Sequence, residues 1–379
     1  MDAVNVLTVN AGSSSLRAHL VDTAAEKVLD SAETGEPANT RESRDTLEKL
    51  LDRLPGEPGA VAHRFVHGGA TVTGPAIAGP RVRAALDAAR SLAPLHQPPA
   101  LALLDLLRDR LPRVPHVVCP DTAFHSGLPE RARTYALPER WRARWDLRRY
   151  GFHGISYGWA VRRAAALLGR PIEELDLLVA HLGGGCSVCA VHGGRSMDTS
   201  MGLTPLEGPA MSKRCGSVDP GLLLSLLRDG KVGLEELAPA LQSESGLLGL
   251  SGISGDTRDL VRAAKDGDVR ASFAMAVFEH QVSRALAGVA ASLGRIDALV
   301  FTGDIGWDQP EVAESVADGL GVLGIRGGLD TRRDADAVIS GPGTGVPVLV
   351  VASREELELA ALAARAAEDG HDEPRRATG

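Results

Sequence analysis

The hydrophobic pattern of the chain alternates between short apolar runs and longer segments with a helical repeat. Three apolar runs each lead into a turn rich in glycine and polar residues: VLTVNAGSSS (6–15), DLLVAHLGGGCSVCAVHGG (176–194) and DALVFTGDIG (297–306). The first two continue beyond the turn, over 16–21 and 187–192, as the second strand of a hairpin. We therefore expect three strand-and-turn units, two of them hairpins.

Between these units, apolar residues recur with a period of about 3.6, which predicts helices. The predicted helices cover 82–93, 99–111, 158–168, 269–293 and 354–367. Residues 31–58 are polar and contain Pro and Gly, so they are interpreted as a variable surface region, and the charged tail 368–379 is expected to fray. The pattern predicts an α/β fold in which two related strand-hairpin units face each other.

The chain length of 379 residues favours two domains. The expected domain I covers 1–120 with a return at about 358–379, and domain II covers 121–357. The net charge is −8 and no basic face is visible, which argues against binding nucleic acid. Because the pattern contains neither a signal peptide nor an apolar run of about 18 residues, we expect a cytoplasmic protein that does not bind membranes.

The four cysteines predict buried thiols rather than a metal site. Cys186 and Cys189 form one CxxC pair, and no second ligand pair is placed to complete a zinc site. Residues three apart in a strand point to opposite faces of the sheet, so these two thiols would not converge on one ion.

The turns rich in glycine and serine suggest an anion site. Successive backbone N–H groups in such a turn form a concave nest that binds phosphate, although one turn of this kind is equally typical of an ordinary hairpin. Three of them favour a bound nucleotide between two domains. The chain has no GxxxxGK[ST] motif and no GxGxxG motif that opens a helix, so a P-loop and a dinucleotide fold are disfavoured.

Charged residues also stand beside apolar sequence. Arg64, Asp121 and His153 are examples, and each alone has a structural alternative: a strand-end ion pair for Arg64, a helix cap for Asp121. His63 and His67 are expected to be structural. Taken together, the two arginines Arg64 and Arg214, with His153 and an acid, suit an anionic substrate and a metal.

The motifs together resemble a known family. The segments are NAGSSSLR, HRFVHGG, APLHQPP, PDTAFH, RRYGFHGIS, HLGGGCS, DTSMGLTPLEGPAMSKRCGSVDPG and SGISGDTR. In order and spacing, from about residue 6 to residue 356, they resemble the signature segments of the acetate kinases. The resemblance implies a two-domain actin-like ATPase fold, which is ribonuclease H-like and has an interdomain cleft. It also implies reversible, direct in-line phosphoryl transfer from ATP to acetate, with Mg²⁺ or Mn²⁺, by a homodimer.

The resemblance further implies roles for individual residues. The catalytic residues would be Arg64, Asp121, His153 and Arg214. The acetate pocket would contain Arg64, Val66, Leu95, Phe152 and Pro205. The nucleotide would be bound by Ser13, Ser15, Arg17, His181, Gly183, Gly185, Asp256, Arg258, Gly303, Asp304 and Gly306. The metal would be held by Asn10 and Glu355. Since acetate is already ionised at pH 7, the chemistry needs cations and positioning rather than a general base.

Two of the turns depart from the family pattern. Gly184 stands where the family usually has Asn, and Asp304 and Trp307 stand where it usually has Gly and Glu. Because an Asp adds negative charge near phosphate, these departures leave pyrophosphate open as the phosphoryl donor. Since an apolar pocket discriminates weakly against one extra methylene, a propionate kinase is an alternative too, as is a nucleotide-binding relative without catalysis.

Overall fold

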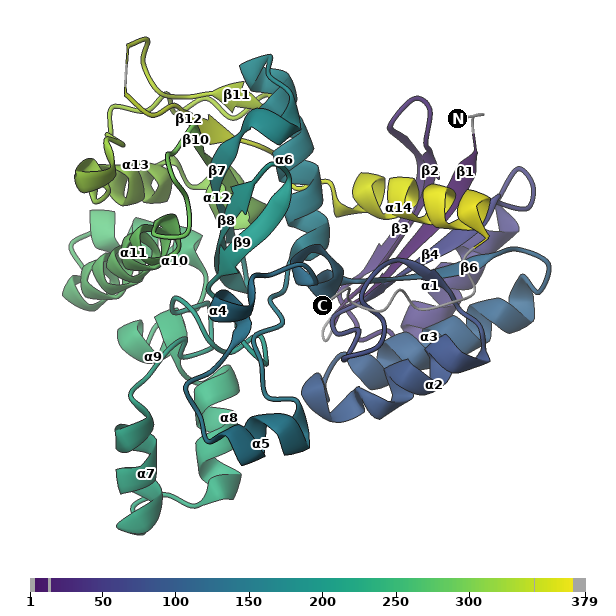
Figure 1. Ribbon diagram of the computed structural model, residues 1–379, viewed down its shortest axis with the longest axis horizontal. Helices are drawn as coiled ribbons and strands as arrows, with labels where there is room; N and C mark the ends of the chain where they lie inside the picture. The colour runs from purple at the N-terminus through teal and green to yellow at the C-terminus, as the bar shows by residue number, and fades with distance from the viewer. Residues whose placement is uncertain (1–3, 13–14, 344, 371–379) are drawn as a thin grey trace. The chain divides into compact units, whose positions relative to one another are not determined.

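The chain folds into two compact units, each built around one mixed sheet (Figure 1). The computed structural model describes residues 4–12, 15–343 and 345–370. Unit 1 comprises Met1–Gly127, Phe152–Trp159 and Arg354–Gly379, and unit 2 comprises Leu128–Gly151 and Ala160–Ser353. The predicted α/β class is confirmed, whereas the predicted domain boundaries stay a prediction.

In the described residues, the sheet of unit 1 has the strand order β3-β2-β1-β4-β6-β5. Its strands are β1 (Asn5–Ala11), β2 (Leu16–Asp22), β3 (Lys27–Thr34), β4 (Ala60–Phe65), β5 (Ala76–Ile77) and β6 (His116–Pro120). β2 pairs in the antiparallel direction with both β1 and β3, whereas β1, β4 and β6 are parallel. The carboxyl ends of β1, β4 and β6 therefore lie at one edge of the sheet.

Strand alternation divides the core of unit 1 into two layers. Leu7 and Val61 belong to the cluster that includes side chains of α1 (Arg41–Asp52), α2 (Pro80–Ala88) and α3 (Gln97–Arg110). Their neighbours Val6 and Ala60 belong to a second cluster, with α14 (Glu355–Asp369). Since successive side chains of a strand point to opposite faces, each strand contributes to both layers.

The sheet of unit 2 repeats this connectivity, with the strand order β11-β12-β10-β7-β8-β9 in the described residues. Its strands are β7 (Asp176–Leu182), β8 (Cys186–His192), β9 (Arg195–Thr199), β10 (Ala298–Thr302), β11 (Ala337–Val338) and β12 (Val348–Val350). β8 pairs in the antiparallel direction with both β7 and β9, and β7, β10 and β12 are parallel. The order β9-β8-β7-β10-β12 thus corresponds to β3-β2-β1-β4-β6 of unit 1.

The helices follow the predicted pattern closely. α3, α6 (Gly154–Leu168), α11 (Val269–Ala290) and α14 match predicted helices, and α2 with the 3₁₀ turn η1 (Arg90–Leu92) matches a fifth. The remaining helices are α4 (Glu130–Arg133), α5 (Glu139–Trp145), α7 (Pro220–Arg228), α8 (Leu234–Ser243), α9 (Gly246–Ser251), α10 (Thr257–Lys265), α12 (Gly303–Asp308) and α13 (Pro310–Asp318). The other 3₁₀ turns are η2 (Asp121–His125), η3 (Ile172–Glu174) and η4 (Gly321–Leu323). The predicted hairpin partners are β2 and β8.

The interpretation of 31–58 as a variable surface region was wrong. This stretch contains the end of β3 and all of α1, whose Leu47 and Leu50 are fully buried. β3 alternates between exposed and half-buried residues because it lies at the sheet edge, and α1 buries only a narrow stripe. Both patterns are polar enough to imitate a loop.

The four cysteines are free thiols, and the predicted burial is confirmed for three of them. Cys119, Cys186 and Cys189 are buried and Cys215 is partly buried. Burial raises the pKa of the Cys186 and Cys189 thiols to about 12 each, so both stay protonated at neutral pH. Within the described ranges, no group of three or more His, Cys, Asp or Glu is placed to hold a metal ion, and no helix has both the length and the apolar character needed to cross a membrane.

Candidate active site

In unit 1, three polar residues meet at the carboxyl ends of the parallel strands. Asn10 lies near the end of β1, Arg64 near the end of β4, and Asp121 directly follows β6. Arg64 donates from Nε and Nη2 to the two Asp121 carboxylate oxygens, at 3.0 and 2.7 Å, and from Nη1 to Asn10 Oδ1 at 3.1 Å. The parallel strand pairing therefore brings together residues separated by more than fifty positions.

A fourth residue reaches the same arginine from α14. Glu355 is the first residue of this helix, and its Oε2 lies 3.6 Å from Arg64 Nη1. Burial works to lower the pKa of Arg64, but the charges of Asp121 and Glu355 outweigh it and raise the pKa. Burial raises the pKa of Asp121 despite its bond to Arg64, and Glu355 adds to the effect. The cluster is thus a fixed cation with two carboxylates and an amide oxygen around it.

The turn before α6 is held in an uncommon conformation. His153 has a φ of 61°, in the left-handed region that residues other than glycine seldom adopt. A Cβ on the next residue, Gly154, would lie 2.1 Å from the Asp121 carbonyl oxygen and 2.6 Å from Phe124 Cβ. His125 Nε2 lies 3.0 Å from the Phe152 carbonyl oxygen. Close packing against the Asp121 segment therefore fixes where His153 is presented, and such strain is typical of functional turns.

The residues assigned to the acetate pocket are found in different environments. Phe152 is buried, and its ring meets the His67 ring edge-on at 5.5 Å between centroids. Val66 is half-buried, whereas Leu95 is 61% exposed. These three belong to unit 1, and Pro205 belongs to unit 2, where its carbonyl oxygen accepts a 3.1 Å hydrogen bond from Arg214.

Arg214 differs from Arg64 in having no acidic partner among the residues that the structure describes. Its nitrogens reach the Pro205 carbonyl oxygen and, at 3.9 Å, the Met211 sulfur. No carboxylate of the described residues forms an ion pair with it, and burial lowers its pKa. A half-buried cation without a counter-ion is prepared to accept an anionic ligand.

A cavity of about 460 Å³ in unit 2 is lined by several of the residues predicted to bind the nucleotide. Gly183 and Gly184 line it from the turn after β7, Asp304 from α12, and Asp256 and Arg258 from the start of α10. Asp256 caps α10 and binds the Arg258 guanidinium, with 2.6 Å between Asp256 Oδ2 and Arg258 Nη2. The ends of parallel β7 and β10 thus form one wall of this cavity, and the α10 terminus another.

Comparison with known proteins identifies the family. A model of the "Acetokinase family" matches residues 44–361. The acetate kinase of Deinococcus radiodurans is 42% identical, with 93% of this chain and 96% of that protein covered, and that of Clavibacter michiganensis is 42% identical, with 94% and 97% covered. The chain belongs to the acetokinase family.

 The predicted family membership is confirmed.

Solved structures of the acetokinase family share this fold. The acetate kinase of Porphyromonas gingivalis superposes with a TM-score of 0.88 at 31% identity, covering 96% of this chain and 100% of that one. A propionate kinase from Francisella tularensis gives a TM-score of 0.86 at 28% identity, covering 96% and 99%. The similarity therefore extends over both units and includes relatives named for two different acyl substrates.

The structure places the residues that depart from the acetokinase pattern on the cavity wall of unit 2. Gly184 and Asp304 both line the cavity, and both are exposed. Trp307 lies in the same short helix, α12, which begins at Gly303 directly after β10, where the sequence predicts a turn. Gly303 has a φ of 81°, and a Cβ there would lie 2.5 Å from the Leu182 carbonyl oxygen. Gly303 is therefore required for the close approach of α12 to β7.

The other predicted nucleotide residues lie near the turns. His181 and Thr302 are paired across β7 and β10, and the Gly183 N–H donates to the Gly185 carbonyl oxygen at 3.1 Å. Gly306 is buried in α12. In unit 1, the Gly12 N–H donates to the Ser15 carbonyl oxygen at 2.8 Å, and Arg17 is exposed on β2 opposite Asn10. Ser13 lies outside the described residues.

A polar network in unit 2 was not predicted from the sequence. Glu207 accepts hydrogen bonds from the Tyr135 hydroxyl at 2.6 Å and from Arg149 Nη2 at 2.8 Å. Arg149 Nη1 also donates to the Ser200 and Met201 carbonyl oxygens, each at 3.0 Å. The signal was present, since Arg149 and Glu207 stand in two of the quoted family segments, but their pairing depends on the fold.

Proposed function

We propose that this acetokinase-family chain is an acetate kinase, which transfers the terminal phosphoryl group of ATP to acetate and forms acetyl phosphate and ADP reversibly. The observation that carries the proposal is the Arg64 cluster. Arg64 is fixed by two bonds to Asp121, and its Nη1 faces Asn10 and Glu355. Such a preorganised cation suits a reaction between a carboxylate and a phosphoryl group.

The chemistry consists of one bond exchange. An acetate oxygen forms a bond to the terminal phosphorus while the bond from that phosphorus to the bridging oxygen of ADP breaks. Acetate is ionised at neutral pH, so no proton has to be removed from it. We assign Arg64 and Arg214 to the acetate carboxylate and the transferring phosphoryl group, and His153 to the charge that develops on the phosphoryl oxygens.

The residues suit a divalent metal bound mainly through water. Asn10 Oδ1 and Glu355 Oε2 lie 3.1 and 3.6 Å from Arg64 Nη1, so two hard oxygen donors are close to each other beside this guanidinium. Mg²⁺ prefers such donors and keeps several of its waters. We propose that Asn10 and Glu355 hold Mg²⁺ or Mn²⁺, which would neutralise phosphate charge, while Asp121 keeps Arg64 in position.

The nucleotide is assigned to unit 2. The backbone N–H groups of the turn at Gly183 and Gly185 are suited to phosphate, together with His181. The cavity of about 460 Å³ is large enough for a nucleoside, and Asp256 and Arg258 at its wall offer polar groups to the adenosine.

The first test is a hydroxamate assay of the purified protein with acetate, Mg²⁺ and ATP, beside a reaction in which pyrophosphate replaces ATP. We expect acyl hydroxamate from ATP. Product formed only with pyrophosphate would reassign the donor, and product with neither would favour a nucleotide-binding relative without catalysis.

A second candidate function is propionate kinase, because the chain superposes well on a propionate kinase. One methylene in an apolar pocket contributes about 1–3 kcal/mol, so propionate should be used as well. Rates with acetate, propionate and butyrate at equal concentration would rank the substrates, and a kcat/KM higher for propionate would exchange the two assignments.

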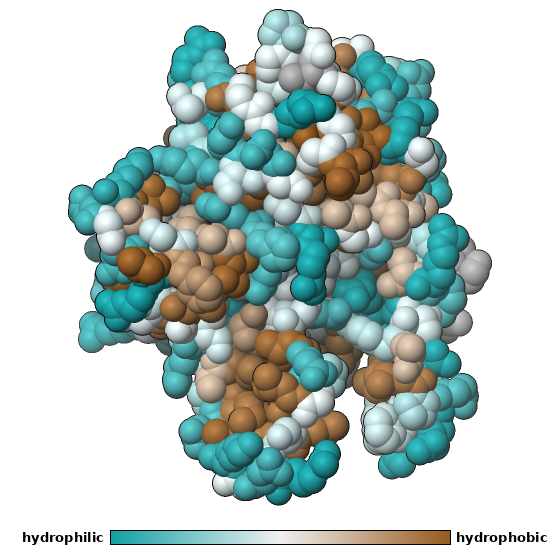
Figure 2. Space-filling view, turned by 90° about the vertical axis from the view of Figure 1, so that its left-hand side faces the viewer, coloured by the Kyte–Doolittle hydropathy of each residue, from teal (hydrophilic) through white to brown (hydrophobic). Residues whose placement is uncertain are grey.

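We also propose a homodimer in the cytoplasm, and α7 supports the dimer. None of its residues is buried, and Leu222, Leu224 and Leu227 are 50%, 57% and 39% exposed. Hydrophobic residues gather on the lower part of the face in Figure 2, the side of the molecule on which Figure 1 shows α7. An apolar helix face of this kind is typical of a surface covered by a second copy.

Light scattering during size-exclusion chromatography tests the dimer. Leu224→Glu should convert a dimer into a monomer. Val322→Glu is the matched control, since Val322 is 90% exposed in the same unit but not on α7. A monomeric wild-type protein, or a dimer that tolerates Leu224→Glu, would contradict the assignment.

A further inference from the structure

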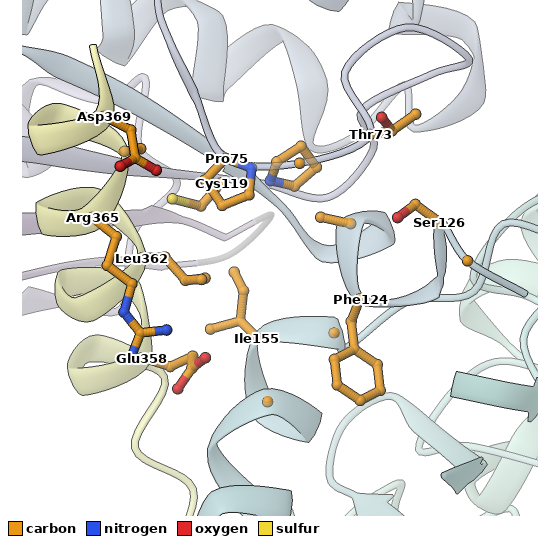
Figure 3. Close-up of a pocket in the computed structure, with 17 residues that line it drawn as sticks. Thr73, Pro75, Cys119, Phe124, Ser126, Ile155, Glu358, Leu362, Arg365 and Asp369 are labelled. Carbon is orange, nitrogen blue, oxygen red and sulfur yellow. The ribbon is translucent and has the colours of Figure 1, made fainter. Parts of the chain in front are cut away.

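Unit 1 contains a cavity that the proposed reaction does not use (Figure 3). Its volume is about 530 Å³, and it lies on the α14 face of the sheet. α14 lines one side with Glu358, Leu362 and Arg365, and Phe124 and Ser126 line the opposite side. The volume is within the range of small-molecule sites in proteins.

The cavity combines an apolar wall with opposite charges. Pro75, Phe124, Ile155 and Leu362 supply the wall. Glu358 and Arg365 are seven residues apart on α14, and therefore lie on the same side of the helix two turns apart. Arg365 forms no ion pair with a carboxylate of the described residues, and its side chain is exposed. Its guanidinium is therefore available to a carboxylate from solution.

We infer that this cavity binds a small zwitterion with an apolar side chain, that is, an apolar α-amino acid. Its carboxylate pairs with Arg365, its ammonium group faces the carboxylate of Glu358, and its side chain contacts Phe124, Ile155 and Leu362. A simple fatty acid would satisfy only the cation, and a simple amine only the Glu358 carboxylate. The site needs no turnover, so the inference is independent of the proposed function.

Two glycines allow the cavity to be filled without disturbing the fold. Gly74 and Gly127 line it, and a Cβ at either position would have no atom within 4 Å. Gly74→Leu should therefore occupy the cavity at little cost in stability, and Gly127→Leu offers a second filling variant. Gly56, also in unit 1 with no atom within 4 Å of its Cβ position, provides the matched control Gly56→Leu.

The experiment is calorimetric titration of the full chain with L-leucine in saturating acetate, which occupies any acyl site. We expect binding to the wild type and to Gly56→Leu, at least tenfold weaker binding to Gly74→Leu, and weaker binding to Arg365→Gln. Arg44→Gln, a change of an exposed arginine on α1, should bind as the wild type does. Parallel titrations use 4-methylpentanoate and 3-methylbutylamine, which each lack one charge of leucine, and both should bind at least tenfold more weakly.

The inference would be overturned by no heat of binding with the wild type, or by equal binding to the wild type, Gly74→Leu and Gly127→Leu. Binding of 4-methylpentanoate as tight as that of L-leucine would overturn the assignment to a zwitterion. Circular dichroism of each variant separates a lost site from a lost fold.

Discussion

The sheets of unit 1 and unit 2 have corresponding strand orders, yet their functional ends differ. In unit 1, the ends of β1, β4 and β6 carry the side chains of Asn10, Arg64 and Asp121, bound to one another. In unit 2, the ends of β7 and β10 carry glycine-rich backbone at a cavity. One sheet topology can therefore present fixed side-chain charges in one unit and backbone N–H donors in the other.

The two units also differ in their arginines, Arg64 and Arg214. Replacing these arginines should have the largest effects of all the changes proposed. We expect Arg64→Ala and Arg214→Ala each to lower the rate of acetyl phosphate formation about 10³-fold, the scale of an arginine that stabilises a phosphoryl-transfer transition state. Only Arg64→Ala should also lower the free energy of unfolding, by about 3 kcal/mol, because it leaves the buried Asp121 unpaired. Steady-state rates and urea unfolding measure the two effects.

The control for both is Arg83→Ala. Arg83 pairs with Asp105 and Asp87 near the surface of unit 1, so its loss should cost less than about 1 kcal/mol and leave the rate unchanged. A rate loss below tenfold for Arg64→Ala or Arg214→Ala would remove that arginine from the proposed site.

The backbone character of the unit 2 site can be tested at its glycines. Gly303→Ala should lower the free energy of unfolding by about 2 kcal/mol, because its φ is 81° and the added Cβ would lie 2.5 Å from the Leu182 carbonyl oxygen. Gly184→Ala, with no atom within 4 Å of the Cβ, should change it by less than about 0.5 kcal/mol. Urea unfolding distinguishes them, and equal effects would contradict the close approach of α12 and β7.

Unit 1 should also be the more acid-sensitive unit. It buries His63 and His116 with 3.0 Å between His63 Nε2 and His116 Nδ1. Burial lowers the pKa of both, for His63 well below its usual 6.5, and the neighbouring imidazole lowers that of His63 further. Below pH 6.5 the unfolded chain therefore takes up protons that the folded chain does not, and stability falls with falling pH.

The expected slope is about 1.4 kcal/mol per pH unit for each histidine between pH 6.5 and its folded pKa. His63→Gln should flatten the dependence of the urea midpoint between pH 7.5 and 5.5. His280→Gln, at an exposed position in unit 2, should leave the slope unchanged. If both variants keep the wild-type slope, the buried pair is not the cause.

The smallest effect is expected at Asp304. Asp304→Gly removes a carboxylate from the wall of the nucleotide cavity, so KM for ATP should fall roughly two- to fivefold, the size of an exposed charge interaction. Asp266→Gly, at the far end of α10, is the control. A higher KM for Asp304→Gly would instead indicate that this carboxylate contacts the ribose hydroxyls.

The sequence predicted the hairpins and long helices because their periodicities are strong. The buried hairpin β7–β8 and the helix α11 are examples. It missed β3 and α1, because an edge strand and a helix with one narrow buried stripe look polar. It also assigned a turn after β10, where α12 begins, because glycines are typical of turns and do not reveal a short helix.

For the site, the sequence predicted which residues take part but not which of them are in contact. Asn10, Arg64, Asp121 and Glu355 come from four distant segments, and only parallel pairing of β1, β4 and β6, with α14 beside them, brings them to one guanidinium. The absence of an ion-paired acid at Arg214 in the described residues likewise depends on tertiary structure. The sequence gives the identity of each side chain, but whether its charge is neutralised depends on residues that only the fold brings near it.

The two-residue strands β5 and β11 have a consequence for how the molecule behaves in a crowded solution. Each closes the parallel edge of its sheet in the antiparallel direction, and each is followed within a few residues by a proline, Pro80 after β5 and Pro342 after β11. A short strand that soon meets a residue without an N–H gives little backbone for another chain to extend. Both sheets are thereby protected at this edge against strand addition, the route by which open sheets aggregate.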